Sequence, residues 1–312
     1  MWFGSARTLA VAGVLASTGG AVVGARNLLT GQAVQARSVI PKALDIPPRA
    51  DGIYAPGGTP VRRFERGVAV GLHVMVFGDS MATGYGCRNA DDVPGALIAR
   101  GLADRSGRLV RLSTKAIVGA TSKGLTSQVD AMLVAAAPPD VAVIMIGAND
   151  VTSLNGIGGS ARRLGAAVRR LRASGTAVVV GTCPDFGVVT AIPQPLRWTA
   201  RSLGLRLAGA QAAETRAAGG VPVPIAALLT SHFLTEPQRL FSDDHYHPSA
   251  DGYALIAAHL LPAVCDALSE SIPELVWARD PVAAVATPLD RLSRLLRRRP
   301  GGVPVTGELP TG

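Results

Sequence analysis

The sequence predicts an α/β fold, a three-layer α/β/α sandwich around a parallel sheet of five strands. Two observations support this prediction. Short apolar runs alternate along the chain with longer amphipathic stretches, which is typical of a parallel sheet covered by helices on both faces. Polar motifs follow several of these runs, at the strand ends where proteins of this class bind their ligands.

Five apolar runs have the length and the composition of buried strands. The runs at 72–77 and 141–146 are the most apolar and are rich in β-branched residues. The strand candidates in chain order are 72–77, 109–115, 141–146, 177–182 and a short run at 221–224.

Helical stretches occupy the intervals between and after these strands. Each would carry the chain back across the sheet, so that the carboxyl ends of all the strands meet at one edge. The predicted helices are 93–105, 124–136, 160–173, 196–218 and 249–267.

The first strand candidate runs directly into the motif Gly78-Asp79-Ser80. A serine at the carboxyl end of a buried strand is placed to act as a nucleophile, although the same serine could simply cap the next helix. A serine hydroxyl is a weak nucleophile at neutral pH. The catalytic interpretation of Ser80 therefore requires a general base elsewhere in the chain.

Two further strand ends carry groups that can bind an anion. Gly119 follows the second strand, and a glycine there lets the backbone approach a reacting group closely. Asn149 follows the third strand and offers a side-chain amide, although it could instead tie down its own loop, as Asp150 is expected to do. With the backbone N–H of Ser80, these groups are candidate donors to an ester oxyanion.

The segment 244–248 places a carboxylate and a histidine in one short loop before the last helix. An imidazole can act as a base near neutral pH, and an acceptor on its other nitrogen holds it in one tautomer. His247 and Asp244 fit these two roles. Local geometry does not exclude His245, because residues two apart share a face in extended backbone, and Asp243 is the competing carboxylate.

Together these segments resemble the SGNH hydrolase family, also called GDSL esterases and lipases. The four family blocks occur in order and at the expected separations, within residues 72–268. They are GDS at 78–80, the glycine at 119, GxND at 147–150 and DxxHP at 244–248. Within the family, the apolar N-terminus and the alanine- and arginine-rich body are most similar to exported actinobacterial esterases.

The resemblance implies a flavodoxin-like fold and a serine esterase that hydrolyses carboxylic esters through an acyl-enzyme, without a cofactor. Its DxxHP block selects His247 over His245 and Asp244 over Asp243. Asp79 is expected to support the turn rather than to take part in catalysis. The implied catalytic triad is Ser80, His247 and Asp244, and the implied oxyanion donors are Ser80, Gly119 and Asn149.

Other activities remain compatible with these residues. The same site could transfer an acyl group, or remove acetyl groups from glycans or lipids of the cell envelope. A non-catalytic surface-binding protein could also retain the fold, but the intact triad and Asn149 argue against that alternative. The natural ester and its chain length do not follow from the sequence.

No metal site is expected. The five histidines are scattered, apart from His245 and His247, whereas a zinc site needs three or four ligands at recognisable spacing. The glycines at 156–159 lack the Lys-Ser/Thr ending of a phosphate-binding loop. The three cysteines are expected to be buried thiols without a catalytic role, although an extracytoplasmic location would permit a disulfide between two of them.

The catalytic domain is expected to span residues 70–270. Residues 1–36 are predicted to be a signal peptide or a membrane anchor, because residues 8–25 carry no charge and follow a basic start. Residues 37–69 have the proline and glycine content of a linker, and 271–312 form a basic, Pro/Gly-rich tail. The protein is therefore expected to be exported, either secreted or tethered to the membrane.

The net charge of +9 raises the question of an anionic partner. Nucleic acid is not expected, because aromatic residues for base stacking make up only 4% of the chain. Anionic lipid or wall polymer suits an exported protein better. Leucine and arginine recur at helical spacing over 289–299, which fits a segment resting on a membrane or a solvated helix end before a disordered tail.

Overall fold

The computed structural model describes residues 45–65, 67–135 and 137–277, and before them residues 24, 27, 28, 30–32 and 34. In this part of the chain six strands form one sheet, in the order β1-β3-β2-β4-β5-β6. The five predicted strands are all present and run parallel to one another. They are β2 (Leu72–Gly78), β3 (Val110–Thr114), β4 (Val141–Met145), β5 (Ala177–Gly181) and β6 (Val221–Val223).

The prediction of a five-stranded, wholly parallel sheet is wrong by one strand. β1 (Gly52–Tyr54) pairs antiparallel with β3 and lies within the segment expected to be a linker. All three of its residues are buried, and the Tyr54 hydroxyl donates to the backbone carbonyl of Ala50 at 2.7 Å. Ile53 pairs in turn with Arg62, so the chain folds back along this edge of the sheet.

The five predicted helices are present, each with its ends within about one turn of the expected residues. The structure adds short helices at strand ends and a further helix, α8, in the interval before the last predicted helix. The helices are α2 (Ser80–Thr83), α3 (Pro94–Ser106), α4 (Ser122–Ala135), α5 (Ala148–Thr152), α6 (Ile157–Ala173), α7 (Leu196–Ala217), α8 (Ile225–Thr235), α9 (Pro237–Leu240) and α10 (Ala250–Ser271), with 3₁₀ turns η1 (Ala90–Asp92) and η2 (Phe186–Val188).

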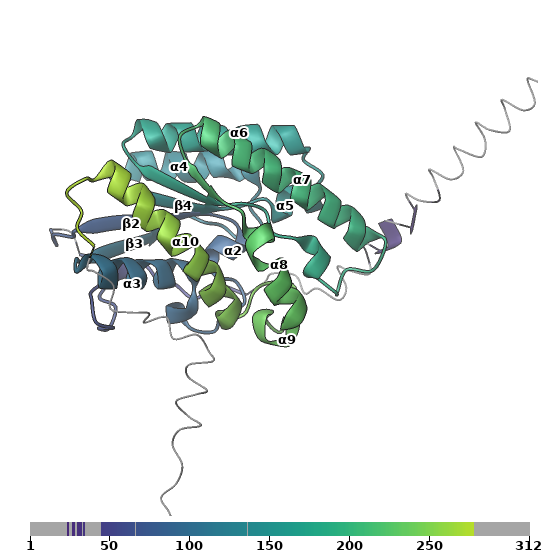
Figure 1. Ribbon diagram of the computed structural model, residues 1–312, viewed down its shortest axis with the longest axis horizontal. Coiled ribbons are helices and arrows are strands. Elements are labelled where there is room, and N and C mark those ends of the chain that lie inside the picture. The colour runs from purple at the N-terminus through teal and green to yellow at the C-terminus, as the bar shows by residue number, and fades with distance from the viewer. Residues whose placement is uncertain are drawn as a thin grey trace, which may run out of the picture. The chain divides into compact units, whose positions relative to one another are not determined.

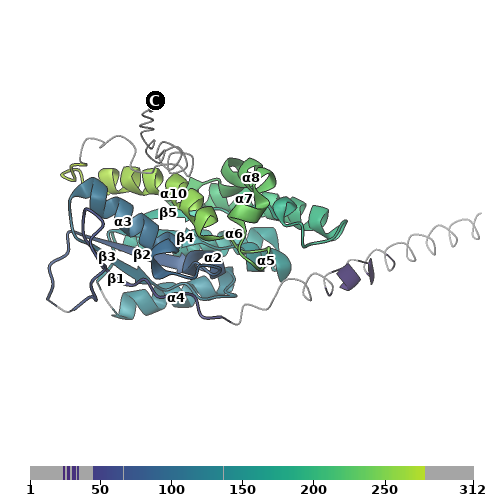
Figure 2. The same ribbon diagram turned by 90° about the horizontal axis from the view of Figure 1, so that it is seen from below.

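The helices form a layer on each side of the sheet, with α3 and α10 on one face and α4 and α6 on the other (Figures 1 and 2). Successive residues of β2 show how both faces are filled. Val74 and Val76 join the core beneath α3 and α10, whereas Met75 and Phe77 join the core beneath α4 and α6. Burial on both faces explains why β2, β4 and β5 are almost continuously apolar.

The order of the strands positions the site. From β2 the chain passes to β3 on one side and then crosses to β4 on the other side of β2. In open α/β sheets, ligands bind at the carboxyl ends of the strands, at the point where the order reverses in this way. The turns after β2 and β4 carry Ser80 and Asn149.

Among the described helices, α10 is long and apolar enough to cross a membrane, but more than half of its apolar stretch is buried inside the protein. It packs against α3 and β5, so we interpret it as a core helix. The predicted export segment at 8–25, apart from residue 24, and the leucine- and arginine-rich segment at 289–299 lie outside the described residues.

Candidate active site

The turn after β2 holds Ser80 at the first position of α2. Gly78 has a φ of 134°, and a Cβ at this position would lie 1.8 Å from the carbonyl oxygen of Met145, so only glycine fits. The Asp79 carboxylate accepts the backbone N–H of Met81 at 3.0 Å and thereby caps α2. These contacts give the nearly buried Ser80 hydroxyl a defined position.

A chain of hydrogen bonds connects Ser80 to His247 and Asp244. Ser80 Oγ lies 2.9 Å from His247 Nε2, and His247 Nδ1 lies 2.6 Å from Asp244 Oδ2. With a proton on Nδ1 donated to Asp244, Nε2 is free to accept the hydroxyl proton of Ser80. The structure thus brings together the three residues that the sequence singles out.

The Asp244 carboxylate is fixed by its own loop. Its Oδ1 accepts hydrogen bonds from the Ser242 hydroxyl at 2.8 Å and from the backbone N–H groups of Tyr246 and His247 at 2.9 and 2.8 Å. Burial alone would raise the pKa of Asp244, but the hydrogen bonds and the charge of His247 outweigh it and lower the pKa to about 2. Asp244 is therefore ionised at neutral pH.

Aromatic rings hold the imidazole of His247 in place. The ring of Tyr85 lies 4.6 Å from it, centroid to centroid, and that of Tyr246 lies 4.9 Å away in an edge-on arrangement. The hydroxyl of the buried Tyr253 donates to the carbonyl oxygen of Tyr85 at 2.7 Å, which fixes the first of these contacts. His247 is left with little freedom to rotate.

The competing residues of this loop face solvent. His245 is exposed and has a φ of 54°, so the backbone turns there and separates its ring from that of His247. Asp243 forms an ion pair with Arg88 at 2.7 Å, with both side chains more than four-fifths exposed. Neither side chain forms a hydrogen bond or ion pair with Ser80, as the DxxHP pattern implies.

The candidate oxyanion donors are connected to one another. The N–H of Ile117 donates to the carbonyl oxygen of Gly78 at 3.1 Å, which joins the loop of Gly119 to the turn of Ser80. Asn149 Nδ2 donates to the carbonyl oxygen of Ala120 at 3.0 Å, which leaves its second N–H available. The N–H groups of Ser80 and Gly119 have no acceptor among the described residues.

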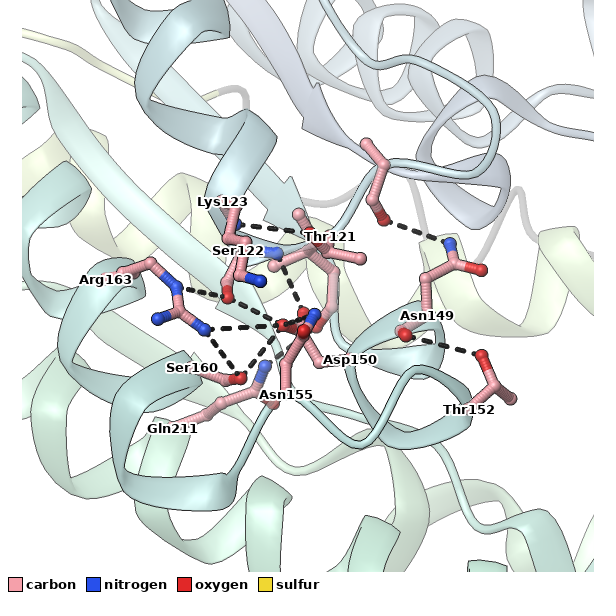
Figure 3. A network of polar contacts seen from close by, with 12 residues as sticks. Thr121, Ser122, Lys123, Asn149, Asp150, Thr152, Asn155, Ser160, Arg163 and Gln211 are labelled. Carbon is pink, nitrogen blue, oxygen red and sulfur yellow. Dashed lines mark hydrogen bonds and ion pairs between the residues drawn. The ribbon is translucent and has the colours of Figure 1, made fainter.

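Asp150, beside Asn149, anchors this side of the site (Figure 3). Its buried carboxylate accepts the hydroxyls of Ser122 and Ser160 at 2.7 and 2.8 Å, the amide of Asn155 at 3.2 Å and the backbone N–H of Ser122 at 2.8 Å. A buried charge needs such partners. Asp150 thus ties α5 to the starts of α4 and α6, in the bracing role expected from the sequence.

An apolar pocket with a volume of about 60 Å³ opens beside Ser80 and His247. The sequence analysis did not predict it, because its walls come from η2 and from α8, which was not predicted either. The run of eleven mostly apolar residues in α8 was the available signal. Apolar residues that line the pocket include Phe186, Val189, Ile225, Leu229, Phe233 and Phe241.

One charged residue also borders the pocket. Asp185 accepts hydrogen bonds from the Thr230 hydroxyl at 3.1 Å, from the backbone N–H of Gly187 at 2.7 Å and from Nε of Arg201 at 3.1 Å. Its charge is therefore paired within the protein, and the space beside Ser80 is suited to hydrocarbon.

The described residues contain no group of three or more His, Cys, Asp or Glu side chains that could hold a metal ion. Cys87, Cys183 and Cys265 are free and buried, as expected. Burial raises the pKa of Cys87 to about 12, so this thiol is not a nucleophile at neutral pH.

Known proteins resemble this chain over most of its length. The model of the GDSL-like lipase/acylhydrolase family matches residues 76–255. The GDSL-like esterase Rv1075c of Mycobacterium tuberculosis is 59% identical over 305 residues, which cover 96% of this chain and 97% of that protein.

Solved structures with a similar fold include the crystal structure of TesA, at 24% identity and a TM-score of 0.49, covering 64% of this chain and 99% of that one. Another is LAE5, an α/β hydrolase enzyme from the metagenome of Lake Arreo in Spain. LAE5 is 20% identical, with a TM-score of 0.48, and the match covers 64% of this chain and 97% of the LAE5 chain.

Proposed function

This chain belongs to the GDSL-like lipase/acylhydrolase family and is a carboxylic ester hydrolase, and we propose that it works through an acyl-enzyme formed on Ser80. The observation that carries the proposal is the hydrogen-bonded series Ser80 Oγ, His247 Nε2, His247 Nδ1 and Asp244 Oδ2. Such a series can activate a serine hydroxyl at neutral pH.

In the first half of the reaction, Ser80 Oγ forms a bond to the ester carbonyl carbon while its proton passes to His247 Nε2. The carbonyl π electrons move to the oxygen, giving a tetrahedral oxyanion. When that intermediate collapses, the bond from carbon to the alcohol oxygen breaks and the imidazolium protonates the leaving alcohol. Asp244, ionised throughout, keeps the ring oriented and stabilises its positive charge.

In the second half, water takes the place of the alcohol. His247 removes a proton from the water as its oxygen attacks the acyl carbon, and the proton then passes to Ser80 Oγ as the carboxylic acid leaves. The N–H groups of Ser80 and Gly119 and the free N–H of Asn149 bind the oxyanion in both halves. Each such donor is typically worth about 10²- to 10³-fold in kcat.

Replacement of Ser80 by Ala tests the proposal. We expect ester hydrolysis to fall to background while the melting temperature stays close to that of the wild type. Covalent labelling by an organophosphonate, mapped by mass spectrometry to the peptide with Ser80, should disappear in the same variant. Near-normal turnover in a folded Ser80→Ala protein would exclude Ser80 as the nucleophile.

We further propose that the pocket beside Ser80 binds a short, apolar acyl chain. The walls are almost wholly hydrocarbon, which favours an alkyl group over a sugar. A water-sized group needs about 10–15 Å³, so a volume of about 60 Å³ has room for roughly four to six methylene-sized groups.

A series of nitrophenyl esters of increasing acyl length measures this preference. We expect kcat/KM to rise from acetate to about hexanoate, as each buried CH₂ contributes about 0.8 kcal/mol, and to fall for longer chains. Acetylated sugars and lysophospholipids are measured beside them. A maximum at long acyl chains or on acetylated sugars would contradict the assignment of the pocket.

We also propose that the enzyme acts outside the cytoplasm. The support is the uncharged segment 8–25 behind a basic start. Fusion of residues 1–69 to a reporter that is active only after export tests this. An inactive reporter in cells that make the full-length fusion would overturn it.

A further inference from the structure

Gln128 makes an unusual pair of contacts from α4 to the strand that carries the nucleophile. Its Oε1 accepts the backbone N–H of Gly78 at 2.8 Å, and its Nε2 donates to the carbonyl oxygen of Gly78, also at 2.8 Å. The side chain is almost fully buried among apolar residues of α4 and the sheet. Both polar ends of the amide are therefore committed to a single residue, two positions before Ser80.

These contacts replace a missing strand. β3 ends at Thr114, which pairs with Val76, so the sheet offers Gly78 no strand partner on that side. Without Gln128 the buried N–H of Gly78 would remain unpaired, which is costly inside a protein, and its carbonyl oxygen would keep only the N–H of Ile117 as a partner. Gln128 supplies one donor and one acceptor, as the next residue of a strand would.

The carbonyl oxygen of Gly78 has a second partner, the N–H of Ile117 at 3.1 Å, in the loop that carries Gly119. One oxygen therefore joins three segments, namely the nucleophile turn, the Gly119 loop and α4. The loop is linked onward, because Ala120 accepts a hydrogen bond from Asn149. By holding Gly78 in place, Gln128 thus helps to set the position of the Ser80 turn relative to the loop that carries Gly119.

We propose that Gln128 is a positioning residue for catalysis, which holds the N–H groups of Ser80 and Gly119 at the separation that the oxyanion requires. This inference rests on the proposed function of Ser80 and Gly119. Gln128 acts through Gly78 and touches no reacting atom. Because donors act mainly on the transition state, a small misplacement should lower kcat far more than it changes KM.

The test compares two variants of the full-length protein on the same helix. Gln128→Met keeps the length of the side chain and removes both hydrogen bonds. Met132→Ala is the matched control, because Met132 lies one turn further along α4 and is completely buried in the same core, where truncation of a side chain destabilises the fold. Both variants should have a lower melting temperature.

We expect Gln128→Met to lower kcat by roughly 10- to 100-fold with KM changed by less than about twofold. Met132→Ala should keep the kcat of the wild type at a temperature where it is folded. Equal kcat losses in the two variants, or a wild-type kcat in Gln128→Met, would overturn the proposal. Should Gln128→Met not fold, the same kcat loss is expected in Gln128→Glu, which keeps the acceptor but loses the donor to Gly78.

Phosphonate labelling separates this inference from the proposed function. If Gln128 positions the site, the label is found on Ser80 in the wild type and in Gln128→Met alike. It should form more slowly in Gln128→Met, by about the same factor as the loss in kcat. A label on Ser80 that forms at the wild-type rate refutes the role of Gln128 alone. A label that maps to another residue refutes the assignment of Ser80, and the inference falls with it.

Discussion

At the scale of single residues, the loop that holds Asp244 and His247 shows how neighbouring side chains of the same type acquire different roles. Asp244 points inward and accepts hydrogen bonds from the backbone N–H groups of Tyr246 and His247, whereas Asp243 faces solvent and pairs with Arg88. Two adjacent carboxylates therefore serve as a matched pair for mutagenesis.

Replacement of Asp244 by Asn should lower kcat by up to about 10⁴-fold without unfolding the protein. The amide would favour the wrong tautomer of His247, so that Nε2 could no longer accept the proton of Ser80. Steady-state kinetics with a short-chain nitrophenyl ester, with circular dichroism to verify folding, measure the effect.

Asp243→Asn is the control for this change. An exposed ion pair contributes about 0–1 kcal/mol, so the variant should retain both activity and stability. Comparable losses in the two variants would mean that the loop as a whole had been disturbed.

A second prediction concerns Asp79 and pH. Burial raises the pKa of its carboxyl to about 7, although the N–H groups of Met81 and Gly147 and the charge of His247 act to lower it. The folded state therefore holds this proton more tightly than the unfolded chain. The stability contributed by Asp79 is complete below the unfolded pKa of 3.8 and is lost as the pH rises to about 7.

Asp79→Asn should remove this loss, because the amide is neutral at every pH and its oxygen can still accept the N–H of Met81. The free energy of unfolding of the variant, relative to the wild type, should rise by a few kcal/mol between about pH 4 and pH 7. Urea unfolding at a series of pH values gives this difference directly. A constant difference across the series would place the pKa of Asp79 in its ordinary range.

The sequence predicted Ser80, Asp244, His247, Gly119 and Asn149 because each lies in a short motif at the end of a strand or in one loop. Gln128 and Tyr85 escaped prediction for a physical reason. Gln128 lies in the middle of a helix and reaches Gly78 only through the packing of α4 on the sheet, and Tyr85 contacts a histidine far along the chain. Such roles depend on tertiary contacts that leave no local pattern.

At the scale of elements, α8 determines the shape of the pocket. It is apolar around most of its circumference, so it lacks the periodicity by which the longer helices were predicted. Its residues Ile225, Ala226 and Leu229 all face the space beside Ser80. Changes on this one helix should therefore alter the choice of ester while the reacting groups stay in place.

Two opposite changes on α8 test the size of the pocket. Ala226→Leu adds methyl groups to the wall and should move the optimum toward acetate, with kcat/KM for hexanoate esters reduced about tenfold or more. Leu229→Ala removes part of the wall and should extend the optimum by two or more carbon atoms, at a cost in stability of about 2–5 kcal/mol. Unchanged acyl profiles in both variants would mean that the chain binds elsewhere.

At the scale of the whole molecule, the sheet extends further toward the N-terminus than the sequence predicted. Three of the parallel strands, β2, β4 and β5, are buried along their whole length, which makes each of them a conspicuous, almost continuous apolar run. β1 has three residues within a segment rich in proline and glycine, too short for any periodicity to register. Its position depends on pairing with β3 and on the burial of Tyr54.

Substitutions at Tyr54 measure how far β1 contributes to the fold. Tyr54→Ala should lower the free energy of unfolding by about 3–5 kcal/mol, as expected for the loss of a large buried aromatic ring. Tyr54→Phe removes only the hydrogen bond to Ala50 and should cost about 1 kcal/mol. Full stability of Tyr54→Ala in chemical denaturation would show that the folded core begins at β2.

The loop of Asp244 and His247 is closed at its base, where Phe241 pairs with Pro248 and the N–H of Ser242 donates to the carbonyl oxygen of His247 at 2.8 Å. The acid and the base therefore belong to one closed loop, while Ser80 belongs to the turn between β2 and α2. A displacement between the two parts changes the distance between Ser80 Oγ and His247 Nε2 and the packing of Tyr85 on the imidazole. Such a movement would break the hydrogen bond that activates Ser80 while the bond between His247 and Asp244 stays intact. The site could therefore be switched off without the loss of any of its groups.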